Sequence, residues 1–378
     1  MHYLDNAATT EVSAEAADIA AAVLTRHFAN PSSLYAIGAH SEDCLNKSRA
    51  VIARAMGADA SEVIFTASGS EGNNIAILGA VKARRKWGRH IVATAYEHPS
   101  VQLCVEALAK EGVELTLITP EKDGNVDIDK IINAVTDKTM LVTAMHVNNE
   151  TGAYIDAAAL GKAVKAKNSR TAVHIDGVQA FCKLPFSLTG SGIDSYSVSG
   201  HKIHAPKGIG ALYLRKGYNI EPVLFGGGQE RGMRPGTENI AFAAAFAKSA
   251  ERANADLHSQ MSHVEGLNFF LWKELSYIPD IIRNSPPDAV CGIANFSVAN
   301  IKSETMLHFL ESRDIFVSGG SACSKGAKSH TLSAMGLDDN RIDTALRISI
   351  GAYNTEDDIT ALISSLKDGI ATLAKIKR

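Results

Sequence analysis

The chain has 378 residues, 46% of them hydrophobic, and this length exceeds what one hydrophobic core usually supports, so we expect two domains. The formal net charge of -3 and the pI near 6.5 give no electrostatic basis for a nucleic-acid or membrane partner. The sequence shows no secretory signal pattern at its start and no long apolar stretch, so we expect a cytoplasmic protein without a transmembrane helix.

The five cysteines are odd in number and scattered, and none forms a C-x-x-C pair. This pattern argues against a disulfide framework and against a structural metal site, so we expect reduced thiols. Cys104 lies on the apolar side of a helical pattern and is predicted to be core. Cys323 differs, because it lies in "SGGSACSKGAKSH", residues 318–330, whose Gly, Ser and Lys content predicts an exposed, mobile loop.

From about residue 60 to residue 215, short apolar runs rich in β-forming residues alternate with amphipathic helical patterns. The seven runs are "EVIFTAS", "HIVATAY", "VELTLIT", "MLVTAMHVN", "AVHIDG", "SYSVSG" and "GALYLRK". Such alternation predicts a large α/β domain with a mostly parallel seven-stranded sheet covered on both faces. A long helical pattern follows and runs to about Leu275.

The last part of the chain changes character. It is predicted to form, in order, a strand "GIANFSV", a helix "SETMLHFLESRD", two strands "IFVSGG" and "ALRISIG", and a final helix from "TEDDIT" onward. This order predicts a smaller α+β domain at the C-terminal end. We assign residues 12–260 to the large domain, and residues 1–11 with 261–378 to the small domain that carries the Cys323 loop.

Polar residues follow several predicted strands, and the carboxyl ends of strands are where open α/β sheets bind ligands. The turn containing Gly69 and Ser70 opens a helix after the first strand, and the positive end of a helix suits a phosphate group. His98 follows the second strand. Asn149 follows a later one, although small and polar residues also occur at such turns for purely geometric reasons.

Asp176 and Lys202 end two further strands. A carboxylate in an apolar run is unfavourable unless it meets a cation, and a lysine there is unfavourable unless its amine is neutral or covalently attached. Pyridoxal 5'-phosphate explains both, because it needs a Schiff-base lysine and an acid beside its pyridinium nitrogen. An unrelated α/β enzyme with polar strand ends is the alternative at this point.

Ten motifs occur in order over about 350 residues of the chain. They are "YLDNAATT", "NPSS", "TASGSEGNN", "YEHPSV", "HVNNETG", "HIDGVQ", "SGHKIHAPKG", "GGGQERGMRPGTEN", "GGSACS" and "ALRISIG". Each motif alone is weak, whereas the ordered set is specific. Together they resemble the cysteine desulfurases of the class V aminotransferase group, within fold type I of the pyridoxal-phosphate enzymes.

The resemblance implies a role for each matching residue. Lys202 would be the Schiff-base lysine, Asp176 would pair with the pyridinium nitrogen, and His98 would stack on the ring. The remaining assignments are Gln179 and Asn149 at the ring hydroxyl, Gly69, Ser70, Ser199 and His201 at the phosphate, Thr237 at the phosphate from the other subunit of a homodimer, and Arg347, Asn30 and Asn149 at the substrate carboxylate.

The resemblance also implies the reaction. L-Cysteine would be converted to L-alanine, Cys323 would take the sulfur as a persulfide, and an acceptor protein such as an iron–sulfur scaffold would receive it. His98 would assist proton transfer at the thiol. Two alternatives stay open: another class V enzyme, either a selenocysteine lyase or an aminotransferase, and a non-catalytic docking protein that keeps the fold. His204 and Ala205 stand where an aromatic residue and a glycine are usual.

Overall fold

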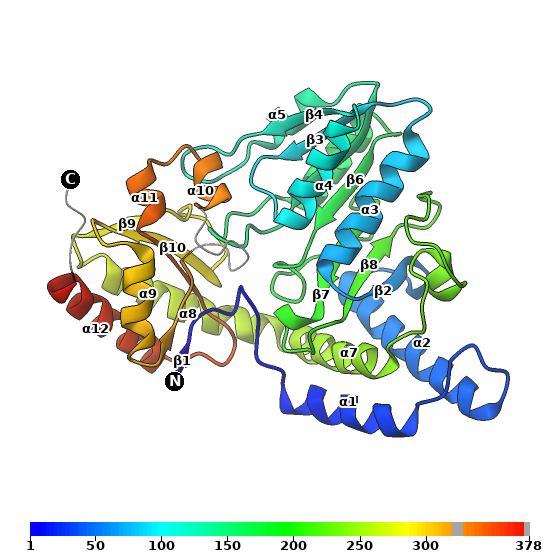
Figure 1. The fold of residues 1–378 in the computed structure, drawn as a ribbon, viewed down its shortest axis with the longest axis horizontal. Helices are drawn as coiled ribbons and strands as arrows, with labels where there is room; N and C mark the ends of the chain where they lie inside the picture. Colours follow the sequence, from blue (N-terminus) through cyan, green and yellow to red (C-terminus); the bar gives the residue numbers. More distant parts are fainter. Residues whose placement is uncertain (320–327, 374–378) are drawn as a thin grey trace.

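The computed structural model describes residues 1–319 and 328–373. A large α/β body and a smaller α+β body lie side by side, and the long helix α8 (Leu257–Leu275) runs between them (Figure 1). The N-terminal end of the chain lies at the smaller body (Figure 1). No helix of the described ranges is long and apolar enough to cross a bilayer.

The seven predicted strands form one sheet in the large body. They are β2 (Val63–Thr66), β3 (His90–Thr94), β4 (Glu114–Ile118), β5 (Thr139–Met145), β6 (Ala172–Asp176), β7 (Ser195–Ser199) and β8 (Gly210–Leu214). Their order is β2-β8-β7-β6-β5-β3-β4, and β8 runs antiparallel to both of its neighbours while the other pairs are parallel. The prediction of a mostly parallel sheet is confirmed.

Helices cover both faces of this sheet because its strands are apolar on both sides. Ile91 of β3 packs on one face with helices α3 (Gly69–Arg84) and α4 (Pro99–Lys110). The next residue, Val92, packs on the other face, where α2 (Ala36–Met56), α5 (Ile128–Ala134), α6 (Ala157–Lys167) and α7 (Ile240–Ala255) lie. Helix α1 (Ala14–Arg26) packs against α7. Each fully buried large apolar side chain contributes about 1.5–3 kcal/mol. Cys104 of α4 is buried, as predicted.

The smaller body has its own core and its own sheets. An antiparallel sheet has the order β12-β10-β9, and a short parallel pair joins β1 to β11. The elements are β1 (His2–Tyr3), β9 (Ile281–Arg283), β10 (Ile293–Val298), β11 (Ile315–Phe316), β12 (Ala345–Ser349), α9 (Ser303–Glu311), α10 (His330–Ala334), α11 (Asp339–Asp343) and α12 (Glu356–Thr372). Leu4 is buried in the same core as α8, α9 and α12. This packing supports the assignment of residues 1–11 to the small domain, which remains a prediction.

Two predicted elements differ from those observed. The long helical pattern up to Leu275 is two helices, α7 and α8, which meet at Asp256. Asp256 has φ -96° and ψ 7°, outside helical geometry, and aspartate is a poor helix-interior residue because its carboxylate competes for backbone donors. Within the described residues 315–319 of the run "IFVSGG", the strand is the two-residue β11, which pairs with β1, a partner that no local pattern indicated.

Candidate active site

The carboxyl ends of β3, β5, β6 and β7 lie at one edge of the sheet, because these four strands are parallel neighbours. His98, Asp176 and Lys202 follow or end three of them. Their charges act on one another: burial lowers the pKa of His98, the Asp176 carboxylate opposes this shift, and the Lys202 ammonium adds to it. The structure therefore brings together the three residues predicted to surround a cofactor ring.

Asp176 is the last residue of β6 and is only 4% exposed. Its Oδ2 accepts a hydrogen bond from Asn73 Nδ2 at 2.7 Å, and its Oδ1 accepts one from the Val178 N–H at 3.0 Å. Both donors are uncharged, and no ion pair to Asp176 occurs within residues 1–319 and 328–373. A buried carboxylate held by uncharged donors suits a protonated ring nitrogen, so the donor set fits pyridoxal 5'-phosphate.

The N-terminus of α3 approaches the sheet very closely. A Cβ atom at Gly69 would lie 2.4 Å from Val178 Cγ2, and one at Gly72 would lie 2.9 Å from Ser197 Oγ, so a side chain at either position would force its neighbour to move. Ser70 lies exposed in the first turn, and the Gly69 position is next to the side chain of Ser199. This arrangement at the positive end of a helix suits an anion such as the phosphate of the cofactor.

His201 follows Ser199 by two residues and is half-buried. Its Nδ1 lies 3.1 Å from Thr9 Oγ1. Burial, together with the charges of Lys202 and Lys207, lowers the pKa of His201 to about 4, so its imidazole is neutral at neutral pH. A neutral imidazole donates one hydrogen bond to a phosphate group without adding charge.

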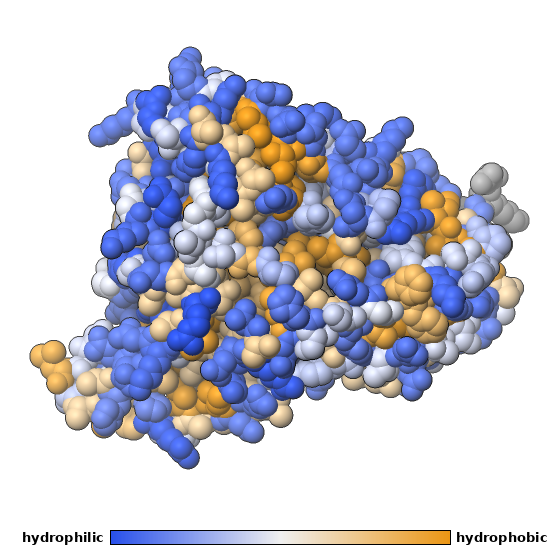
Figure 2. Space-filling model, turned by 180° about the vertical axis from the view of Figure 1, so that it is seen from behind, coloured by the Kyte–Doolittle hydropathy of each residue, from blue (hydrophilic) through white to orange (hydrophobic). Residues whose placement is uncertain are grey.

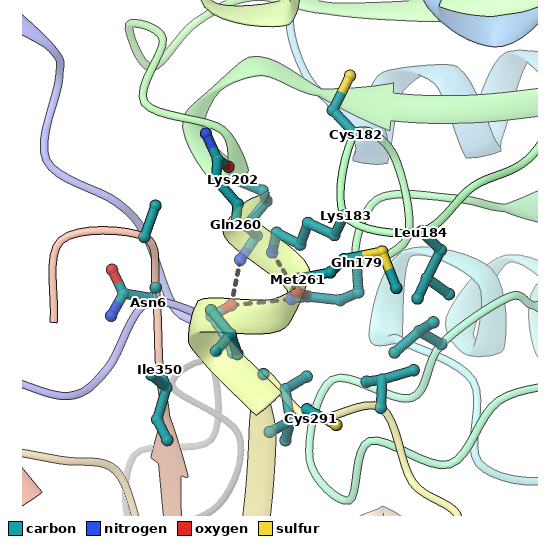
Figure 3. A pocket seen from close by; sticks show the side chains of 18 of the residues that line it. Asn6, Gln179, Cys182, Lys183, Leu184, Lys202, Gln260, Met261, Cys291 and Ile350 are labelled. Carbon is teal, nitrogen blue, oxygen red and sulfur yellow. Dashed lines mark hydrogen bonds between the residues drawn. The ribbon is translucent and has the colours of Figure 1, made fainter. Parts of the chain in front are cut away.

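The N-terminal segment crosses the site and receives hydrogen bonds from two predicted residues (Figure 3). Lys202 Nζ donates to the carbonyls of Ala7 at 2.6 Å and Ala8 at 2.7 Å, and Gln179 Nε2 donates to the Ala7 carbonyl at 2.9 Å. Lys183 Nζ in turn donates to Gln179 Oε1 at 3.2 Å. Lys202, Gln179 and Lys183 all border a cavity of about 290 Å³ between the two bodies.

Arg347 reaches the site from β12 of the smaller body and is only 1% exposed. One terminal nitrogen donates to the Asn149 carbonyl at 2.9 Å, and the other donates to Asp5 Oδ1 at 2.8 Å. Its Nε–H is buried and has no acceptor in the described part of the chain. A buried, unsatisfied guanidinium donor suits a carboxylate oxygen of a bound substrate.

No described contact brings Asn30 or Thr237 to this edge of the same chain, and Thr237 is predicted to act from the partner subunit. Asn30 is exposed in the connection between α1 and α2, where its Oδ1 accepts from the Ser32 N–H at 2.9 Å. Thr237 is exposed in the segment before α7. Cys323 lies outside the described residues.

The sequence model of the aminotransferase class-V family matches residues 2–362. The chain belongs to the class-V aminotransferase family. It is 37% identical to Cysteine desulfurase 2 of Trichormus variabilis over 99% of this chain and 94% of that protein. Among solved structures, it is similar to a NifS-like protein, with a TM-score of 0.93 and 31% identity over 98% of this chain and 99% of that one. It is also similar to SspA in complex with cysteine, with a TM-score of 0.82 and 30% identity over 94% and 100% of the two chains.

The loop after Lys202 contains His204 and Ala205, the two residues that differ from what the resemblance leads us to expect there. His204 has φ +66°, a left-handed conformation that is uncommon for non-glycine residues. Its N–H donates to Thr10 Oγ1 at 2.7 Å, its Nδ1 lies 2.9 Å from the Glu11 carbonyl, and its ring packs on Tyr353 with centroids 4.6 Å apart. These contacts hold the loop to the N-terminal segment, and Ala205 is fully buried beneath it.

Several site residues of this class-V chain were not predicted from the sequence. Asn73 lies four residues after Gly69, on the same face of α3, and this spacing is the one signal that pointed toward the sheet. Glu97 is buried; its Oε1 accepts from Thr94 Oγ1 and from the Met145 N–H at 2.8 Å, while its Oε2 has no described partner. Burial raises the pKa of Glu97 to about 8. Asp5, which pairs with Arg347, had no local signal.

Proposed function

We propose that this class-V protein is a pyridoxal-phosphate-dependent cysteine desulfurase, which converts L-cysteine to L-alanine and receives the sulfur on Cys323 as a persulfide. The observation that carries the proposal is the convergence of Asp176, His98 and Lys202 at one sheet edge, with the unsatisfied Nε–H of Arg347 arriving from the smaller body. The three residues at the sheet edge suit the cofactor, and the Arg347 Nε–H suits the carboxylate of an amino acid. Similarity to a named cysteine desulfurase over nearly the whole chain supports the choice of reaction.

Pyridoxal 5'-phosphate, when bound, supplies an electron sink next to the substrate α-carbon. Lys202 is the residue to which it would be attached, Asp176 would hold its ring nitrogen, and His98 would lie against the ring. The other proposed contacts are Gln179 and Asn149 at the ring hydroxyl, Gly69, Ser70, Ser199 and His201 at the phosphate, and Thr237 of the partner subunit at the phosphate.

Residues of the chain act on three parts of the substrate: its α-carboxylate, its α-proton and its sulfur. The Arg347 guanidinium binds the α-carboxylate, with Asn149 and Asn30 proposed beside it. Lys202, as a free amine, moves the α-proton, and the carbonyls of Ala7 and Ala8 hold its Nζ when it is not attached to the cofactor. The Cys323 thiolate forms a bond to the substrate sulfur while the Cβ–S bond breaks; the released electron pair stays on the carbon fragment, which is protonated to alanine.

We propose a homodimer because large apolar side chains are exposed near the segments that the phosphate site would share. Figure 2 shows apolar side chains at the α1–α2 end of the molecule, at lower left, where Leu24, Phe28 and Leu34 are exposed. Phe225, close in sequence to Thr237, is 81% exposed. Contact between two copies would bury such surface. The proposed sulfur acceptor is a protein, such as an iron–sulfur scaffold, in the cytoplasm.

The test is the quantitation of alanine and sulfide from L-cysteine by the cofactor-loaded protein, with and without a thiol reductant. The wild type should release alanine in both cases and sulfide mainly with reductant, and mass spectrometry should find one added sulfur on the Cys323 peptide. Cys323→Ala should still bind the cofactor and lose nearly all sulfide release. Cys44→Ala, at a half-buried cysteine of α2, is the matched control and should behave as wild type. Normal sulfide release by Cys323→Ala would contradict the proposal and favour another class-V reaction.

A further inference from the structure

Asn73 lies beneath the proposed cofactor site and uses every hydrogen of its amide group. It is 1% exposed on the inner face of α3. Its Nδ2 donates to Asp176 Oδ2 at 2.7 Å and to Ser100 Oγ at 2.9 Å, and its Oδ1 lies 3.0 Å from His174 Nε2. Asn73 therefore links three elements of the sheet edge: α3, the end of β6 and the start of α4.

The direction of these hydrogen bonds follows from the partners. A carboxylate only accepts, so the NH2 group of Asn73 faces Asp176 and its carbonyl faces His174. Burial lowers the pKa of His174 to about 3, so His174 is neutral and donates from Nε2. Its Nδ1 then accepts from Ser195 Oγ at 2.9 Å, which completes a consistent set of donors and acceptors.

The same chain of hydrogen bonds continues to His98. Ser100 Oγ accepts from Asn73, so its own hydrogen is available to His98 Nδ1, 2.8 Å away. The backbone N–H of Ser100 also donates to His98 Nδ1, at 3.1 Å. A backbone N–H cannot accept, so His98 Nδ1 carries no proton, and the neutral ring has its proton on Nε2.

We propose that Asn73 is a positioning residue that joins Asp176 and His98 into one hydrogen-bonded unit. It orients the carboxylate toward the ring nitrogen of the cofactor. Through the Ser100 hydroxyl it adds a second donor to His98 Nδ1, which reinforces the Nε2–H form that the Ser100 backbone N–H imposes. In this form His98 offers a hydrogen-bond donor at Nε2 and cannot accept the proton of a substrate thiol there. The inference deepens the proposed function and rests on it for the identity of the cofactor.

The variants that test the inference are Asn73→Asp, Asn73→Ala, Ser100→Ala and Asn74→Ala. Asn73→Asp keeps the shape of the side chain but removes both donors and places a carboxylate against Asp176. Ser100→Ala interrupts the link to His98 and leaves the hydrogen bond to Asp176. Asn74→Ala is the matched control, because Asn74 is the next residue of α3 and donates to the Ser100 carbonyl at 3.2 Å rather than to the Ser100 hydroxyl.

The first measurement is the dissociation constant of pyridoxal 5'-phosphate, by fluorescence titration of the cofactor-free proteins. Loss of a hydrogen bond to a buried charged group predicts at least about a tenfold weaker affinity for Asn73→Ala and a larger loss for Asn73→Asp. Ser100→Ala and Asn74→Ala should stay within about twofold of wild type. Wild-type affinity in both Asn73 variants would overturn the role at Asp176.

The second measurement is the 15N NMR spectrum of histidine-labelled, cofactor-free protein, with the His98 signals assigned from a His98→Gln variant. Wild type and Asn74→Ala should show an unprotonated Nδ1 and a protonated Nε2 at His98. Asn73→Ala and Ser100→Ala should both shift the Nδ1 signal. A protonated Nδ1 in wild type, or an unchanged Nδ1 signal in both variants, would overturn the link to His98.

These readouts separate the inference from the proposed function. If the wild type releases no sulfide from L-cysteine while the Asn73 variants lose cofactor affinity and shift the His98 signal, the proposed reaction is wrong and the positioning role stands. If the wild type desulfurates cysteine while the variants match it in both measurements, the positioning role is wrong. Circular dichroism of each variant shows that it is folded before it is compared.

Discussion

Two buried carboxylates at opposite edges of the same sheet are held in different ways. Asp194, just before β7, is fully buried and accepts hydrogen bonds from Arg215 Nε at 3.0 Å and Nη2 at 2.8 Å, from Lys165 Nζ, and from the Val173 N–H at 2.8 Å. Asp176, at the end of β6, accepts from an amide side chain and a backbone N–H.

The two carboxylates differ in whether the described part of the chain supplies their compensating cations. Asp194 has its compensating cations inside the chain, so its removal would leave Lys165 and Arg215 without their partner. Asp176 is held in place by uncharged donors, so its charge would be available to the ring nitrogen of the proposed cofactor. Both carboxylates are buried beside a strand terminus, and they differ in the completeness of their charge pairing within the described residues.

The largest expected effect is on activity at the carboxyl edge. Asp176→Asn keeps the shape of the side chain but removes the charge that stabilises a protonated ring nitrogen, so turnover of L-cysteine should fall by two to three orders of magnitude. The free energy of unfolding of the cofactor-free protein should change by less than about 1 kcal/mol. Steady-state kinetics and urea unfolding measure the two quantities. A strong loss of stability would contradict the proposed difference between Asp176 and Asp194.

At the Asp194 edge we expect a loss of stability with little loss of activity. Asp194→Asn leaves two cations without a charged partner, and breaking such a buried pair reduces the free energy of unfolding by about 3 kcal/mol, the lower end of the usual range because Lys165 and Arg215 are partly exposed. Urea unfolding measures this loss. Activity per folded molecule should remain within about twofold of wild type, and a selective loss of activity would contradict a purely structural role.

Glu97 is a third buried carboxyl group, and it predicts how the free energy of unfolding depends on pH. Its pKa is raised from 4.5 to about 8 by burial, so between these values the folded chain binds a proton that the unfolded chain has released. The free energy of unfolding should therefore decrease as pH rises through this range, with a slope approaching about 1.4 kcal/mol per pH unit. Glu97→Gln is permanently neutral and lacks this contribution. Urea unfolding of both cofactor-free proteins at pH 5.5 and 7.5 tests it, since equal pH dependence would contradict the raised pKa.

The smallest effect on the free energy of unfolding is expected at an exposed ion pair. Its N–O distance is similar to that between Arg215 and Asp194. Arg85 Nη2 and Glu111 Oε2 lie 2.7 Å apart, but both side chains are more than half exposed. Water solvates both charges when the pair is absent, so Glu111→Gln should change the free energy of unfolding by less than about 1 kcal/mol. A loss comparable to that of Asp194→Asn would show that burial does not determine how much these ion pairs contribute to the free energy of unfolding.

Much of the large body was predictable because its signals are local. The alternation of apolar strands and amphipathic helices predicted all seven strands of the sheet, since burial on both faces imposes a periodicity within each segment. In parallel strands, chain direction alone places residues such as His98, Asp176 and Lys202 at one edge. Their grouping therefore followed from the sequence before any contact was known.

The remaining features depend on partners that are distant in the chain, and only the tertiary structure decided them. Arg347 meets the Asn149 carbonyl across a separation of 198 residues, and Asn73 meets Asp176 across 103. The sequence around Arg347 and around Asn73 contains no local pattern that predicts the hydrogen-bond partner of either side chain. Sheet order and the packing of the smaller body against the larger one place these groups together, because a buried donor or charge must find its partner wherever the folded chain brings one within hydrogen-bonding distance.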